Sequence, residues 1–74
     1  MGPGAVLKPR EVEAILLSLG FAMVRQRGSH RQHRHADGRS TTVLFHAGRD
    51  LSPLVLRQIC KDIGLTVRSF LDRR

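Results

Sequence analysis

The residues best suited to chemistry lie in one polar stretch of eight, Gly28 to His35, which holds three of the four histidines and two arginines. An imidazole titrates near neutral pH and can accept or donate a proton. A guanidinium can hold phosphate in a planar, bidentate contact. A stretch this polar does not form a core, so we expect it either to line a solvated face or to act on an anion.

His30 is the best candidate for proton transfer, because it follows the turn Gly28-Ser29, next to a basic segment that ends at Arg27. An imidazole placed there can take the proton of a ribose 2′-OH or give one to the leaving 5′-oxygen. RNA supplies its own nucleophile in that hydroxyl. A metal-free ribonuclease therefore needs only positioning, one or two proton carriers and some cations. Ser29 has no carboxylate near it in sequence to complete a hydrolase triad, so we expect it to form a turn hydrogen bond or to touch a phosphate.

The residues expected to hold the RNA backbone flank this histidine or share its strand. Phosphate contacts fix a nucleic acid in place without reading its sequence. We expect the side chains of Arg39 and Arg49, which lie in predicted loops, to be solvated and not to bind RNA. The predicted RNA-binding set is Gly28, Ser29, Arg25, Arg27, Arg31 and Arg34.

His46, at the end of the third predicted strand, is a candidate accessory residue that either faces the same cleft or caps the sheet edge. Aromatic platforms for base stacking are scarce, since the chain has three phenylalanines and no tyrosine or tryptophan. Proteins that read RNA on a sheet stack bases on such rings. We therefore expect backbone contact and weak sequence preference.

A zinc site built from His30, His33 and His35 is the main competing interpretation of the polar stretch. Successive side chains of a strand alternate between faces, so His30 would point away from the other two histidines. A tetrahedral zinc site needs its ligands to converge on one ion. The remaining ligand would have to come from His46 or Cys60, and Cys60 occupies an apolar helix position typical of a core residue. We predict no metal site and no other cofactor.

The amino-acid composition limits the kinds of partner that this chain can bind. With 13 Lys+Arg against 6 Asp+Glu, the formal net charge is +7, which predicts attraction to RNA, DNA, an acidic protein or a membrane surface. The apolar runs are too short for a spanning helix of about 20 residues, so we expect no membrane partner. One cysteine cannot form an intramolecular disulfide, which fits a reducing cytosol and predicts a cytoplasmic protein. On composition alone, a basic surface that binds nucleic acid without cutting it is the more common case.

Two amphipathic helices are predicted at the two sides of this stretch. Between residues 9 and 19 the apolar side chains recur at i, i+3, i+4 and i+7, and Gly20 follows as a stop. The second helix begins at Ser52 and Pro53, a favoured N-cap residue followed by proline at the first helical position. It runs to Gly64 with the same apolar spacing.

Three strands are predicted between the helices. The segment from 21 to 27 begins apolar and ends basic, the segment from 30 to 35 is the polar stretch itself, and the segment from 40 to 46 is rich in β-branched residues. Asp37 and Gly38 form a short hairpin signal between the last two. These segments predict an antiparallel meander.

The expected architecture is a single small α+β domain in the order helix, strand, strand, strand, helix. Both helices cover one face of a three-stranded antiparallel sheet and leave the other face free. Thr66 can cap a last short turn of helix whose apolar residues fold back on the core. We assign residues 1–8 to a disordered leader or cloning remnant and residues 9–74 to the domain.

Five short motifs occur in this order: Leu19-Gly20-Phe21, Gly28-Ser29-His30, His35-Ala36-Asp37-Gly38-Arg39, His46-Ala47-Gly48, and the Leu56-Arg57-Gln58-Ile59 helix that ends at Gly64-Leu65. In order and spacing this set resembles the HicA (YcfA-like) toxins of bacterial and archaeal toxin–antitoxin systems, over nearly the whole chain from about Pro9 to Leu71.

That resemblance implies an mRNA interferase, a metal-independent endoribonuclease with a double-stranded-RNA-binding-domain-like fold, whose single essential histidine corresponds to His30. It also implies an antitoxin of the HicB type, which covers the active face and represses the operon through its own DNA-binding domain. His33 and His35 are not implied to be catalytic. The resemblance shifts the expected function from binding RNA to cleaving it.

Overall fold

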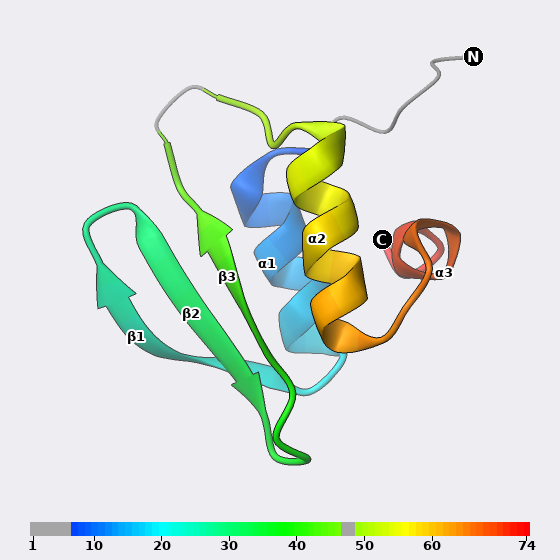
Figure 1. Cartoon of the computed structure of the whole chain (residues 1–74), viewed down its shortest axis with the longest axis horizontal. Helices are drawn as coiled ribbons and strands as arrows, with labels where there is room; N and C mark the ends of the chain where they lie inside the picture. The colour runs from blue at the N-terminus through cyan, green and yellow to red at the C-terminus, as the bar shows by residue number, and fades with distance from the viewer. Residues whose placement is uncertain (1–6, 47–48) are drawn as a thin grey trace.

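The computed structural model describes residues 7–46 and 49–74. Its elements follow the predicted order of helix, three strands and helix, and the predicted short helix follows Thr66 (Figure 1). The elements are α1 (Pro9–Ser18), β1 (Phe21–Arg27), β2 (His30–His35), β3 (Ser40–Leu44), α2 (Pro53–Ile63) and α3 (Val67–Leu71).

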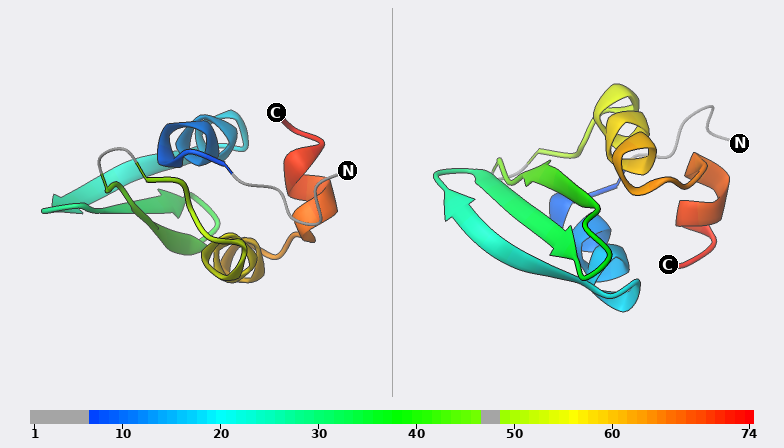
Figure 2. Two further views of the ribbon diagram at one scale, coloured as in Figure 1. Left: turned by 90° about the horizontal axis from the view of Figure 1, so that it is seen from above. Right: turned by 60° about the horizontal axis from the view of Figure 1, so that its bottom comes forward.

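The sheet is antiparallel in the order β1-β2-β3, and α1 and α2 lie on the same side of it (Figures 1 and 2). Helix α1 packs against β1 and β3, and α2 packs against β3. We call the sheet face under the helices the inner face and the opposite one the outer face. The predicted α+β fold of the double-stranded-RNA-binding-domain type is confirmed, and it leaves the outer face uncovered by any element that the structure describes.

The ends of the helices follow from local sequence. The Oγ of Ser52 accepts a hydrogen bond from the Val55 N–H at 3.2 Å, and Gly64 ends α2 in the left-handed region at φ 77°. Thr66 begins α3 by accepting from the Ser69 N–H at 3.0 Å. A glycine tolerates positive φ without the Cβ clash of other residues, which explains the sharp end of α2.

The core lies between the sheet and the helices. Phe70 of α3 is fully buried there, as predicted, and Cys60 is 1% exposed, as expected of a core residue. Burial raises the pKa of the Cys60 thiol. The buried apolar residues are Leu7, Val12, Ile15, Leu16, Phe21, Val43, Leu51, Leu56, Ile59, Cys60, Ile63 and Phe70.

The folded region begins two residues earlier than the sequence predicts. Leu7 is 1% exposed and forms an isolated antiparallel bridge with Leu51, whose N–H donates to the Leu7 carbonyl at 2.8 Å. Lys8 N–H donates to Oε1 of Glu11 at 2.8 Å and so helps to begin α1. The prediction of a disordered leader otherwise concerns residues 1–6, which lie outside the described residues.

Strand β3 is two residues shorter than predicted, because its partner strand ends first. Phe45 N–H still donates to the Ser29 carbonyl, at 2.6 Å. The same register would pair His46 with Gly28, which already belongs to the turn between β1 and β2. No helix in the described part of the chain has the length and apolar character needed to cross a membrane.

Candidate functional site

Strand β2 alternates between the two sheet faces. Its exposed residues are His30, Gln32 and Arg34, whereas His33 is fully buried and Arg31 and His35 are half-buried. This confirms the prediction that His30 points away from His33 and His35. Among the described residues no group of three or more potential ligands is arranged to hold a metal ion.

A bulge at Val24 decides where the arginines of β1 point. Met23 is the partner of His33, but the next pair is Arg25 with Gln32, so one extra residue sits in β1. Residues directly opposite each other in an antiparallel pair share a face. Arg25 therefore joins Gln32 on the outer face, whereas uninterrupted alternation would have turned it towards the helices.

The same register places Arg27 directly opposite His30. Both lie at the end of the first hairpin, where Gly28 has φ 58° and makes the left-handed turn. The Ser29 carbonyl accepts from the Phe45 N–H, which fastens this turn to the end of β3. The backbone that carries His30 is thus held by its pairing with both β1 and β3.

His30 stands at the junction of two concave regions of the surface. A shallow depression of about 190 Å³ on the outer face is lined by Arg25, Arg27, His30, Gln32 and Thr42. His30 is exposed, and its imidazole has no hydrogen-bond partner among the described residues. The guanidinium groups of Arg25 and Arg27 can bind phosphate oxygens in this depression. The imidazole of His30 can then exchange a proton with an oxygen of the bound nucleotide.

The second concave region is a larger groove of about 510 Å³ between β3 and α2, which reaches His30 at one end. Arg34 lies on the outer face too, opposite Ala22 on one side and Ser40 on the other. It stands four residues along β2 from His30, which corresponds to roughly 13 Å of strand. Arg34 therefore extends the basic surface rather than lining the depression.

Arg31 belongs to the inner face. Its Nη1 donates to Oε1 of Glu13 at 3.1 Å, and its guanidinium carbon lies 3.9 Å from the centre of the Phe45 ring. Its Nε atom is buried without a hydrogen-bond partner among the described residues. The side chain is 30% exposed and is held by α1. Arg31 therefore cannot contact the same phosphate as His30, because the two side chains lie on opposite faces of the sheet.

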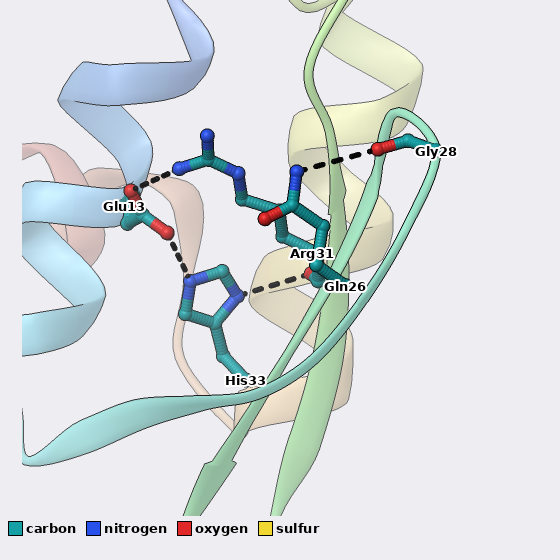
Figure 3. Close-up of polar contacts among 5 residues, drawn as sticks. All are labelled: Glu13, Gln26, Gly28, Arg31 and His33. Atoms are coloured by element: carbon teal, nitrogen blue, oxygen red, sulfur yellow. Dashed lines mark hydrogen bonds and ion pairs between the residues drawn. The ribbon is translucent and has the colours of Figure 1, made fainter.

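Glu13 also binds His33, a contact that the sequence did not predict (Figure 3). His33 Nε2 lies 2.7 Å from Oε2 of Glu13, and its Nδ1 lies 3.1 Å from the Arg31 carbonyl oxygen. Each imidazole nitrogen therefore lies within hydrogen-bond distance of an oxygen atom, one from α1 and one from β2 itself. The one available signal was that Glu13 borders the apolar stripe of α1, three residues before the buried Leu16.

The second hairpin is closed by a separate polar cluster around Asp37. Its Oδ1 accepts from the Arg39 N–H at 3.0 Å and its Oδ2 from the Arg39 Nε at 2.8 Å. The Arg39 N–H is the main cause of a lowered Asp37 pKa. Arg39 Nη1 also donates to the Ile63 carbonyl at 2.6 Å, so this arginine, assigned to solvent from sequence, joins the hairpin to the end of α2.

His46 is exposed beyond the end of β3 and lines neither the depression nor the groove. Arg49 is exposed too. Of the predicted site residues, the described geometry therefore brings together Arg25, Arg27 and His30. Gly28 and Ser29 form the turn that positions them. Arg31 lies on the opposite face of the sheet.

The fold and the site define a small α+β domain with a double-stranded-RNA-binding-domain-like fold, which carries the exposed imidazole of His30 on a basic outer sheet face. The family model described as "HicA toxin of bacterial toxin-antitoxin" matches residues 9–65. The chain therefore belongs to the HicA toxin family of toxin–antitoxin systems, as the sequence motifs indicate. A comparison with individual curated proteins gives no match.

Proposed function

We propose that this toxin is a metal-independent endoribonuclease that cleaves mRNA, with His30 as its general acid or base. The proposal rests on the outer face of the sheet, where the exposed imidazole of His30 lies directly opposite Arg27 and has no hydrogen-bond partner among the described residues. Arg25, two residues before Arg27 in β1, lines the same depression. Membership of a toxin family supports it independently.

The chemistry follows from the residues that line the depression. Arg25 and Arg27 would hold the phosphate and offset the charge that develops on its oxygens. Gln32 and Thr42 are neutral and can hydrogen-bond to phosphate or ribose oxygens. His30 would take the proton of the 2′-OH as that oxygen attacks phosphorus, or give a proton to the 5′-oxygen as its bond to phosphorus breaks. Arg34, farther along β2, would contact a neighbouring phosphate.

The proposal includes two partners and a location. RNA binds the outer face through its backbone, which suits the net charge of +7 and the scarcity of aromatic residues. A HicB-like antitoxin covers the same face and keeps the toxin inactive. Both interactions take place in the cytoplasm, where mRNA is available.

The test is the His30→Ala variant. Expression of the parent chain alone should arrest growth and the variant should not, and purified parent should cleave RNA in EDTA 10²- to 10⁴-fold faster than the variant, the usual contribution of general acid–base catalysis. The variant must keep the parent's circular dichroism spectrum, which is expected because His30 is exposed. Equal cleavage by the two proteins would show that His30 is not the proton carrier.

The alternative is a non-catalytic RNA-binding module, which the same basic outer face favours. It predicts salt-sensitive binding, with log K falling against log salt, but intact RNA after long incubation with the purified parent chain. The two functions therefore differ in the fate of the RNA and not in its binding.

A further inference from the structure

The open edge of β3 presents peptide groups in a fixed pattern. On the two sides of β3, the Phe45 N–H donates to the Ser29 carbonyl and the Arg39 carbonyl accepts from the His35 N–H. The backbone groups of odd-numbered residues in and next to β3 therefore point towards β2. Antiparallel ladders alternate, and the even-numbered residues must direct their N–H and C=O groups away from β2. Because β3 is the last strand of the sheet, these groups face its open edge. The residues concerned are Ser40, Thr42 and Leu44.

These three residues form one wall of the 510 Å³ groove. The opposite wall is α2, which contributes Val55, Ile59, Gln58 and Asp62. No backbone group of the three β3 residues has a hydrogen-bond partner outside the sheet among the described residues. An open row of peptide donors and acceptors beside a partly apolar helix wall is the arrangement to which an added strand binds.

The lining of the groove selects a polypeptide over a nucleic acid. It contains no lysine or arginine and one carboxylate, Asp62, which is held by Thr41 Oγ1 at 2.9 Å and by Gln58 Nε2 at 2.8 Å. A phosphate chain would meet negative charge there and no cation to offset it. A peptide backbone can instead pair with the β3 edge and place an apolar side chain against Val55 and Ile59.

We propose that an extended segment of the antitoxin docks in this groove as a fourth strand paired with β3. The net charge of +7 favours a partner that is acidic overall. Because the groove ends at His30, the added strand covers this imidazole and blocks the depression beside it. The inhibitory consequence rests on the proposed role of His30, but the docking itself does not.

Amide hydrogen exchange followed by NMR tests the docking residue by residue. In the free toxin, the amides of Thr41 and Val43, which bond to β2, should exchange slowly, and those of Ser40, Thr42 and Leu44 should exchange fast. With the purified antitoxin of the same operon bound, the three fast amides should slow by at least tenfold. If they stay fast in a saturated complex, the antitoxin binds elsewhere and the proposal is wrong.

A matched pair of variants provides a second measurement. Ser40→Pro removes one outward N–H and places a ring on the edge at the first residue of the strand, where proline is tolerated. It should weaken antitoxin binding about tenfold or more, whereas Ser40→Ala, which keeps the N–H, should bind like the parent. Equal binding by both variants would overturn the proposal. Ser40 lies outside the depression, so both variants should retain the parent's RNA cleavage rate.

RNA provides the opposing outcome. A short single-stranded RNA added to the His30→Ala variant should leave the amides of Ser40, Thr42 and Leu44 in fast exchange. Protection of these amides by RNA would assign the groove to nucleic acid. If the parent chain cleaves no RNA, the proposed function fails, while the exchange and binding results still decide whether a strand docks on β3.

Discussion

His33 Nε2 lies 2.7 Å from Oε2 of Glu13, so the centre of β2 is joined to α1 through an imidazole with no exposed surface. The second carboxylate oxygen of Glu13 binds Arg31 at 3.1 Å. One helix residue thus holds two neighbouring inner-face residues of the strand whose outer face carries His30. This contact beneath the sheet therefore helps to position the strand that carries His30, together with the pairing of β2 on both sides.

Removing the charge of Glu13 should destabilise the domain. Glu13→Gln weakens two charge-assisted hydrogen bonds in a part-buried site, and we expect the free energy of unfolding to fall by about 1.5–3 kcal/mol. The matched control is Glu11→Gln on the same helix, which keeps an acceptor for the Lys8 N–H and should change it by less than about 0.5 kcal/mol. Urea unfolding monitored by circular dichroism measures both. Similar losses in the two variants would show that the Glu13 contact contributes little.

The two histidines of β2 should separate stability from activity. His33→Ala leaves a cavity and removes the hydrogen-bond partner of one Glu13 carboxylate oxygen, so we expect a loss of about 2–4 kcal/mol in the free energy of unfolding. His30→Ala should cost less than about 0.5 kcal/mol, since its ring is exposed, yet should abolish most RNA cleavage. Thermal unfolding and a cleavage assay at a temperature where both variants are folded provide the comparison. A stable His33→Ala protein would contradict the structural role.

The outer-face arginines should be distinguishable from Arg31 by salt dependence. Each of Arg25→Gln and Arg27→Gln should reduce the slope of log K against log salt for single-stranded RNA by about 0.7, the value for one phosphate contact. Arg31→Gln should leave the slope unchanged and lower the stability of the domain instead. Arg10→Gln, on an exposed position of α1, serves as the charge-matched control. RNA binding would be measured by fluorescence anisotropy in the His30→Ala background, so that the RNA stays intact.

Acid should loosen the second hairpin through Asp37. The pKa of this carboxyl is lowered from its ordinary 3.8, chiefly by the Arg39 N–H, so its ionised form stabilises the folded state. That contribution is present above pH 3.8 and is lost as the pH falls from there through the lower folded-state pKa. The stability difference between the parent and Asp37→Asn should therefore be constant near neutral pH and shrink below about pH 4. A difference that does not change with pH would assign the effect to something other than ionisation.

Much of the fold could be predicted because its signals are local. The helix caps at Ser52 and Gly64 and the alternation along β2 are set by neighbouring residues, and the structure confirms both. The bulge at Val24 could not be predicted in this way, since nothing in Met23-Val24-Arg25 marks an extra residue. It exists only in the pairing of β1 with β2.

The position of Arg31 shows the same limit in the candidate site. Its place on the face opposite His30 follows from alternation, but its partner Glu13 lies 18 positions away in sequence and meets it only when α1 packs on the sheet. The open edge of β3 has a similar origin, because strand order decides which peptide groups stay unpaired. Features of this kind come from tertiary packing and override what residue type alone suggests.

The extra residue at Val24 makes the basic surface depend on length as well as on composition. A relative one residue shorter between Phe21 and Gly28 would need no bulge, because its strand would alternate regularly and still place the counterparts of Arg25 and Arg27 on the outer face. A strand of the present length that paired without the bulge would instead turn Arg25 and Arg27 inward, towards α1. Sequence alignments that ignore this offset will misjudge which cations of a family member share a face with its histidine.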